Sequence, residues 1–175
     1  MTVPQAFASI ARGSADRLFA VAYRILRDVG RAEDAVQQAL VTAWRELPAL
    51  RESGRFEAWI HRILVHACYA EAQRASKWSA NVVALPMDGP ATPDDTSSVV
   101  TRDLLDRGFS RLPTEQRAAF VLHHYLGWSV GEIAENLGVP SETIRSRLRY
   151  ATSTLRAALD ADARTTSTAS RERMA

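Results

Sequence analysis

The sequence has a single cysteine, Cys68, among its 175 residues. One thiol cannot form an internal disulfide and cannot supply a cysteine-rich zinc site. No apolar run approaches the ~18 residues that a membrane-spanning helix needs, and the N-terminus lacks the apolar core of a signal peptide. These absences predict a cytoplasmic protein that is held together by a hydrophobic core. We expect Cys68 to be a small buried residue of that core.

A large excess of charge of one sign is also missing, since the formal net charge is only +2. The chain as a whole is therefore not a polycation, and any contact with nucleic acid must come from local clusters of arginine. No stretch sustains the alternation of apolar and polar residues that is typical of strands, whereas helical spacing of apolar residues is common. We expect an all-α fold of two small helical domains.

The first domain is expected to span residues 1–78 as a helical bundle. Apolar side chains recur three or four residues apart in its helical stretches, which we place at 4–11, 15–27, 31–47 and 56–74. Gly30 is interpreted as a left-handed cap between the second and third of these helices. Trp44 and Trp59 are assigned to the core rather than to a contact surface.

A linker is predicted over residues 79–98, where prolines stand among aspartate, serine and threonine. Proline removes backbone donors and favours extended neighbours. About twenty extended residues reach ~60 Å, which exceeds one ~34 Å turn of B-DNA. A second domain is expected over 99–159, with helices resuming at 99–111. Residues 160–175, rich in threonine, serine and arginine, are expected to be disordered.

The second domain contains the pattern of a helix-turn-helix. A helix that begins at Leu112 is followed by Ser129 and Glu132, whose spacing predicts a capping box at the start of the next helix. Gly138 stands where a tight turn needs a positive φ, and Pro140 suits the first turn of the last helix. Helix, glycine turn and helix in this order indicate a DNA-binding unit.

The last helix is expected to read the DNA. Its apolar residues fall on one side of a helical wheel and face the core: Ile144, Leu148, Ala151 and Leu155. The opposite side carries arginine, which can fork onto guanine, and hydroxyls, which serve bases or phosphates. The residues predicted to contact DNA are Ser141, Thr143, Arg145, Ser146, Arg149 and Tyr150. The alternative is an ordinary solvated helix that happens to carry arginine.

Two separate sets of residues resemble the extracytoplasmic-function (ECF) sigma factors of bacterial RNA polymerase. One set is LPTEQR at 112–117, GWSVGEIA at 127–134 and GVPSETIRSRL at 138–148, which resembles the domain that binds the −35 promoter element. The other is AEDAVQQA at 32–39, followed by Ala43 and Trp44, and FEAWIHRI at 56–63. These are similar to the polymerase-binding helix and the −10-binding helix. The resemblance covers about residues 5–78 and 99–159.

The resemblance implies a sigma factor that directs initiation of transcription and assists strand opening. The helix over 31–47 would dock on the clamp helices of the largest polymerase subunit through Asp34, Gln37 and Gln38. The flap of the polymerase is a further expected contact of the chain. The loop before the −10 helix would hold a flipped base, since a cationic loop beside an aromatic residue can bind phosphate and stack a base. The residues assigned to the −10 element are Arg51, Ser53, Arg55, Phe56, Arg62, His66 and Arg74.

The chain departs from the family pattern on its −10 helix. His66 stands where asparagine is common, and Ala70 and Gln73 stand where aspartate and arginine are frequent. The base sequence that this chain prefers at the −10 element is therefore open. The expected role of the helix in binding that element is unchanged. We expect His66→Ala to weaken promoter opening more than polymerase binding; an equal loss of both would contradict a DNA role for this histidine. Members of this family are commonly bound by an anti-sigma factor. The resemblance therefore implies an anti-sigma factor as a further partner of this chain.

Two other classes of function compete with a sigma factor. An enzyme is disfavoured because His61 and His66 point about 140° apart on a helix of 3.6 residues per turn, and because no glycine-rich phosphate loop or acidic metal cluster is present. No catalytic residue, cofactor or metal is expected. The alternative is a stand-alone helix-turn-helix regulator with an N-terminal sensor or dimerisation domain, which would bind palindromic DNA without polymerase.

Overall fold

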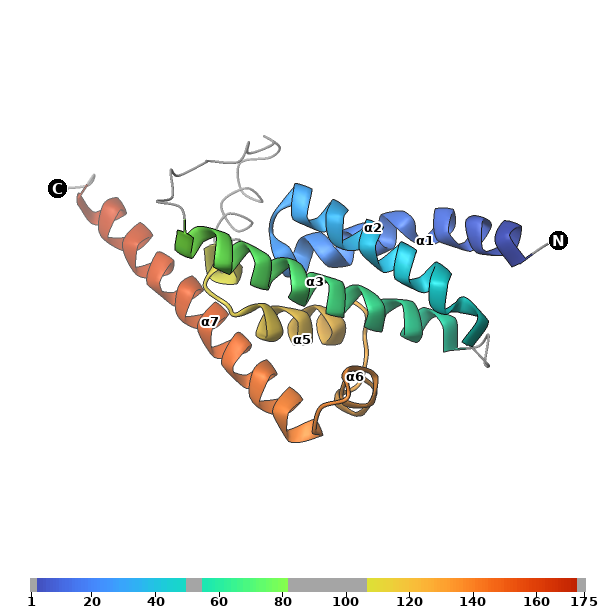
Figure 1. The fold of residues 1–175 in the computed structure, drawn as a ribbon. Helices are drawn as coiled ribbons and strands as arrows, with labels where there is room; N and C mark the ends of the chain where they lie inside the picture. The colour runs from blue at the N-terminus through green and yellow to red at the C-terminus, as the bar shows by residue number, and fades with distance from the viewer. Residues whose placement is uncertain (1–2, 50–54, 82–106, 173–175) are drawn as a thin grey trace.

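The structure is a computed structural model that describes residues 3–49, 55–81 and 107–172 (Figure 1). Within these ranges the chain is helical and contains no strand, which confirms the all-α expectation. The elements are α1 (Val3–Leu26), α2 (Val29–Glu46), the 3-10 turn η1 (Leu47–Ala49), α3 (Phe56–Asn81), α5 (Thr114–His124), α6 (Val130–Leu137) and α7 (Ser141–Glu172). Most of the predicted linker and most of the helix predicted at 99–111 lie outside the described residues.

The boundary between α1 and α2 differs from the expectation. Arg27, not Gly30, has the left-handed backbone, with a φ of 61°, and its N–H donates to the Tyr23 carbonyl over 2.7 Å. Asp28 then caps α2, because its carboxylate accepts from the Arg31 N–H at 2.8 Å. The interpretation of Gly30 was wrong, since a complete N-cap stands two residues earlier and Gly30 lies inside α2.

Three helices are longer than the sequence predicted. One is α3, which was expected to end at Arg74 but continues to Asn81, so the first residues of the predicted linker are helical. The stretches expected at 4–11 and 15–27 are one helix, α1, which passes through Gly13; a single glycine weakens a helix but does not stop it. The prediction of a disordered end after residue 160 was wrong as far as Glu172, because α7 continues to that residue. No proline or glycine occurs between Ser141 and Glu172, so nothing in this stretch breaks the helix.

The N-terminal half (residues 3–81) packs α1, α2 and α3 around a common core. Fully buried residues include Leu18 and Ile25 of α1 and Leu64 of α3, while α2 contributes mainly alanines, which allow the helices to approach closely. Cys68 is buried, as predicted. The core assignment of Trp44 was wrong: its side chain is 45% exposed. Trp59 is partly buried against the core.

The C-terminal half (residues 107–172) packs α5 and α6 against α7. The predicted inner side of α7 is confirmed, since Ile144, Ala151 and Leu155 are buried and Leu148 is partly buried. The two halves are not separate bodies, however. Figure 1 shows α5 running alongside α3, and α5 also contacts α1 while α6 contacts α3. Buried residues from both halves therefore form one contiguous hydrophobic cluster.

Candidate nucleic-acid interface

The helix-turn-helix comprises α6, the turn at Gly138 and the first turns of α7. The Ser129 hydroxyl accepts from the Glu132 N–H over 3.2 Å, and the Glu132 carboxylate accepts from the Ser129 N–H over 2.8 Å. These hydrogen bonds from Ser129 lower the pKa of the Glu132 carboxyl. Gly138 ends α6 with a φ of 67°. The predicted capping box and the predicted glycine turn are both confirmed, and they fix the angle at which α7 leaves α6.

The outer side of α7 carries the side chains that were predicted to contact DNA. Arg145, Arg149 and Tyr150 are exposed, whereas Ser141, Thr143 and Ser146 are half-buried. The Arg145 guanidinium lies 3.3 Å from the Glu142 carboxylate of the same helix, and the Arg149 guanidinium lies 5.4 Å from the centre of the Tyr150 ring. In these two contacts, both arginines interact with residues of α7 itself. Exposed pairs of this kind are weak and can exchange for phosphates or bases.

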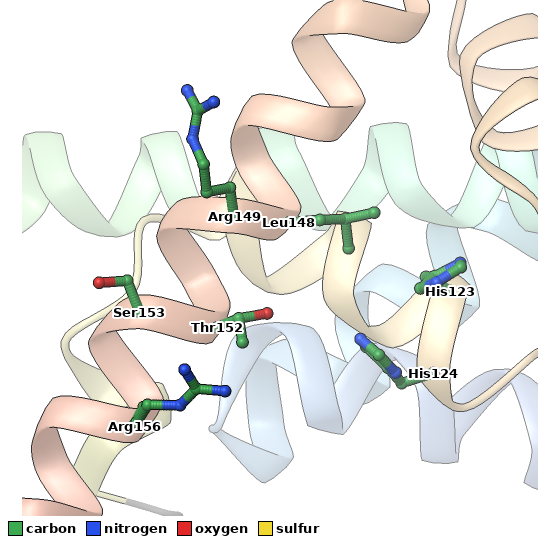
Figure 2. A pocket seen from close by; sticks show the side chains of 7 residues that line it. All are labelled: His123, His124, Leu148, Arg149, Thr152, Ser153 and Arg156. Atoms are coloured by element: carbon green, nitrogen blue, oxygen red, sulfur yellow. The ribbon is translucent and has the colours of Figure 1, made fainter.

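The polar side of α7 continues past the predicted residues into a cavity of about 470 Å³ (Figure 2). The cavity lies between α5 and α7, and none of its lining residues carries a carboxylate. The lining residues are His123, His124, Leu148, Arg149, Thr152, Ser153 and Arg156. In Figure 2 the Thr152 side chain points towards the two histidines, while Arg149 and Ser153 point outwards. The basic surface therefore extends along α7 as far as Arg156.

The two histidines of this cavity were missed as site residues by the sequence analysis. His123 Nδ1 lies 2.6 Å from the Trp128 carbonyl, and because a carbonyl can only accept, Nδ1 carries the proton. Burial, followed by the nearby His123, lowers the pKa of His124. The adjacent pair was visible in the sequence, but only the packing of α5 on α7 places it beside Arg156.

The residues predicted for the −10 element lie at the start and on the outer side of α3. Arg55 and Phe56 open this helix, with the Phe56 ring 5.7 Å from that of Trp59. The exposed members further along are Arg62, His66 and Arg74, of which Arg74 pairs with Glu71. Burial, followed by the charge of Arg62, lowers the pKa of His66. Arg51 and Ser53 lie outside the described residues.

The residues predicted to bind polymerase are exposed on α2. Asp34, Gln37 and Gln38 point away from the core alanines of this helix, and Gln38 Nε2 donates to the Thr42 hydroxyl over 3.5 Å. Val41 and Trp44 follow at spacings of three or four residues, so both lie on the same side of α2, and both are exposed. The structure thereby adds two apolar side chains to this surface, one of which the sequence analysis had placed in the core.

The two histidines of α3 lie on different sides of the helix. His61 is buried and His66 is exposed on another side of the helix, as their spacing predicted. Among the described residues, no three His, Cys, Asp or Glu side chains lie close enough together to hold a metal ion. No helix in the described part of the chain is both long and apolar enough to cross a membrane.

Comparison with known proteins gives two family matches in the same order as the two halves. Residues 11–77 match Sigma-70 region 2, and residues 102–154 match Sigma-70, region 4. The ECF RNA polymerase sigma factor SigL of Mycobacterium tuberculosis is 31% identical over 146 residues, covering 81% of this chain and 82% of SigL. SigM of the same species is 35% identical over 140 residues, covering 75% of this chain and 70% of SigM.

Two solved structures share the fold. The sigma factor RpoE from Bartonella quintana, in complex with the anti-sigma factor NepR, superposes with a TM-score of 0.73 at 22% identity, covering 90% of this chain and 99% of RpoE. CnrH, in complex with the cytosolic domain of CnrY, gives 0.62 at 24% identity, covering 91% of this chain and 90% of CnrH. The two family matches and the identities to SigL and SigM show that the chain belongs to the ECF sigma factors of the sigma-70 family and is an RNA polymerase sigma factor.

Proposed function

We propose that the outer side of α7 reads the −35 promoter element. The observation that carries this proposal is the combination of a fixed helix-turn-helix angle with an exposed basic side on its second helix. Arg145 and Arg149 have the fork geometry that suits guanine in the major groove. Arg156, at the far end of the cavity, lies about 10 Å further along the helix from Arg149 at 1.5 Å per residue, and it would hold a backbone phosphate rather than a base.

The start of α3 is proposed to bind the −10 element. Arg55 supplies a cation beside the aromatic ring of Phe56, which is the pairing that single-stranded nucleic acid favours. Arg62 and His66 are four residues apart and share one side of the helix, so they extend this surface along the strand. Arg51 and Ser53 remain predictions from the sequence.

The outer side of α2 is proposed as the docking surface for core polymerase. Asp34, Gln37 and Gln38 offer polar contacts, and the exposed Trp44 offers the large apolar anchor that interfaces commonly use. The chemistry of RNA synthesis would remain with the polymerase, so the chain itself would be a cytoplasmic initiation factor rather than an enzyme. Because RpoE of Bartonella quintana was solved in complex with the anti-sigma factor NepR, an anti-sigma factor is proposed as a regulator of this chain as well.

Reconstitution with core polymerase tests these assignments together. The chain plus core enzyme should start transcripts at discrete sites, and mapping those starts gives the promoter sequences. Arg149→Ala and Arg62→Ala should each reduce initiation without reducing co-purification with polymerase, whereas Gln38→Ala should reduce co-purification. Specific binding of the free chain to palindromic DNA as a dimer, with no effect on core polymerase, would favour the stand-alone regulator instead.

A further inference from the structure

A second cavity, of about 280 Å³, lies where α5 packs against the end of α1. We call it the α1–α5 pocket, and it shares only His124 with the cavity between α5 and α7. Its lining residues are Arg24, Arg27, Phe109, Phe120, Val121, His124 and Tyr125. Among these described residues, none carries a carboxylate. Two arginines and several aromatic rings therefore line one small space that the proposed contacts with DNA and polymerase do not use.

The rings of the α1–α5 pocket pack against one another at short spacings. Phe109 and Phe120 meet edge to face, with centroids 5.3 Å apart, and the Phe120 ring lies 4.3 Å from that of His124. Burial, followed by the nearby His123, lowers the pKa of His124, so the uncharged imidazole dominates at neutral pH. Flat rings held in this way favour a flat aromatic ligand, which can make the same edge-to-face or offset contacts.

Arg24 is held in a fixed position by two contacts. Its guanidinium lies 4.0 Å from the centre of the Tyr125 ring, and its Nη1 donates to the Ala20 carbonyl over 2.9 Å. A guanidinium has five N–H donors in one plane, and stacking on a ring uses its face rather than its edge. The edge of Arg24 therefore keeps donors for a ligand, and the planar fork matches a carboxylate.

Arg27 stands at a position where the backbone favours glycine. Its φ is 61°, in the left-handed region that a residue with a Cβ adopts only at a cost. The Arg27 guanidinium lies 5.3 Å from the centre of the Tyr23 ring and 5.9 Å from that of Phe109. Glycine would make the same turn without strain, but it would bring no guanidinium to the pocket. Backbone strain of this kind is typical of ligand sites.

A third arginine adds to the positive charge near the pocket. Burial, followed by the charge of Arg27, lowers the pKa of Arg117 on α5, and the Glu115 carboxylate opposes this shift. Arg117 Nε is also buried without a hydrogen-bond partner among the described residues. Like charges this close disfavour each other, and an anion bound beside them relieves the repulsion. The electrostatics therefore favour a negatively charged ligand.

We propose that the α1–α5 pocket is a binding site for a small aromatic carboxylate. Arg24 and Arg27 would hold the carboxylate, and the ring would lie against Phe109 and Phe120. Pockets for drug-sized ligands run from about 300 to 1,000 Å³, so a cavity of about 280 Å³ suits an acid of one or two rings rather than a nucleotide. The proposal uses none of the residues assigned to DNA or polymerase, so it does not depend on the proposed function.

Titration of the full chain with indole-3-carboxylate tests the site. The amide ¹H–¹⁵N shifts of the chain would report binding, and we expect a saturable response with a Kd on the order of 0.1–1 mM, as for other fragment-sized ligands. Indole-3-carboxamide has the same size and ring but no charge, and it should bind roughly tenfold more weakly or less tightly still. Equal binding of the acid and the amide, or no saturation by the acid, would overturn the proposal.

The same titration locates the ligand. The largest shifts should occur at the end of α1 and along α5, at Arg27, Phe120 and Tyr125. Shifts centred instead on Thr152 and Arg156 would place the acid in the basic cavity between α5 and α7. That outcome would show a general attraction of anions to the basic surface and would refute a site at the α1–α5 pocket.

Arg27→Gly is the sharpest variant, because glycine suits the left-handed backbone and the chain should keep its thermal stability. We expect it to weaken binding of indole-3-carboxylate roughly tenfold or more, since a charge-assisted hydrogen bond is lost. Arg111→Gly is the matched control: Arg111 is exposed in the turn before α5, does not line the pocket, and loses the same charge. Equal weakening by both substitutions would contradict the proposal.

Arg24→Gln provides a second test that leaves the turn at Arg27 unchanged. Glutamine removes the positive charge and the fork on the helix that bears it, so binding of the acid should again fall roughly tenfold or more. Unchanged binding would refute the role of Arg24 and with it the proposed site. All of these measurements use the chain without DNA or polymerase, so their failure would leave the proposed function untouched.

Discussion

His61 has its two ring nitrogens in different surroundings at the junction of the halves. Nδ1 donates to the Glu57 carbonyl over 2.7 Å, while Nε2 is buried beside Trp128 without a partner among the described residues. Burial lowers the pKa of the imidazole below 6.5; the Glu57 carbonyl and carboxylate oppose this shift, and the Arg17 guanidinium adds to it. The folded chain therefore favours the neutral ring.

Acidification should destabilise the folded chain through His61. Because the pKa is lower in the folded state than in the unfolded state, the contribution to stability is complete above pH ~6.5 and is lost as the pH falls through the folded value. Urea unfolding at pH 7.5 and pH 5.5 should show this loss. His61→Phe should reduce the loss more than His66→Phe does, since His66 is exposed. An identical pH dependence in both variants would contradict the assignment.

Arg149 of α7 is one of the residues predicted to contact DNA, and it also lines the cavity between α5 and α7. Removing it should cost about 1–3 kcal/mol of promoter binding, or roughly 5- to 160-fold in affinity, and should relax the base preference at one position of the −35 element. Arg149→Ala would be assayed as holoenzyme on a promoter and on point variants of its −35 element. Arg111→Ala, exposed in the turn before α5, is the control. A uniform loss across all −35 variants would indicate a phosphate contact instead.

At the scale of elements, the sequence correctly predicted the features that depend only on residues close together in the chain. The capping box of Ser129 and the turn at Gly138 are local, and a helical wheel was sufficient to orient α7. The boundary at Arg27 was missed because an arginine in left-handed backbone has no sequence signal, whereas Gly30 nearby seemed to supply one. Other contacts join residues far apart in sequence, such as the hydrogen bond that Asn136 Nδ2 donates to the Ala58 carbonyl. No local pattern could predict contacts of this kind.

A difference of one residue along α2 explains why Trp44 was wrongly predicted to lie in the core. On α2 the buried residues end with Ala43, and the next residue is turned by about 100°, so Trp44 leaves the core. Trp44 lies seven residues after Gln37, close to two helical turns, and therefore shares the outer side of α2 with it. Trp44→Ala should therefore weaken binding to core polymerase by about 2 kcal/mol, as truncation of an aromatic anchor typically does, with little loss of stability.

The control for this substitution is Trp78→Ala, since Trp78 is 73% exposed near the end of α3. Titration of labelled core polymerase would measure affinity, and urea unfolding would measure stability. If Trp44→Ala destabilised the chain strongly while leaving polymerase affinity unchanged, the side chain would be structural rather than part of the docking surface.

At the scale of the whole molecule, the two proposed DNA-binding surfaces lie on different halves of the chain, and the net charge of +2 gives little general attraction to DNA. Each half should bind its element weakly when alone. Joining two weak sites raises the overall affinity only where the connecting chain can span both. Promoter binding should therefore depend on the length of chain between the halves more than on its composition.

Shortening this connection tests the dependence on length. Deletion of residues 86–95 would remove about 33 Å of reach at ~3.3 Å per residue, while leaving every described helix intact. We expect transcription from a −35/−10 promoter to fall at least tenfold, with co-purification with core polymerase unchanged because α2 is untouched. Replacing the same ten residues by glycine and serine keeps the length and should keep activity. If the deletion were harmless and the replacement harmful, the segment would act through its own side chains, and the two halves would not be working as spaced, linked sites.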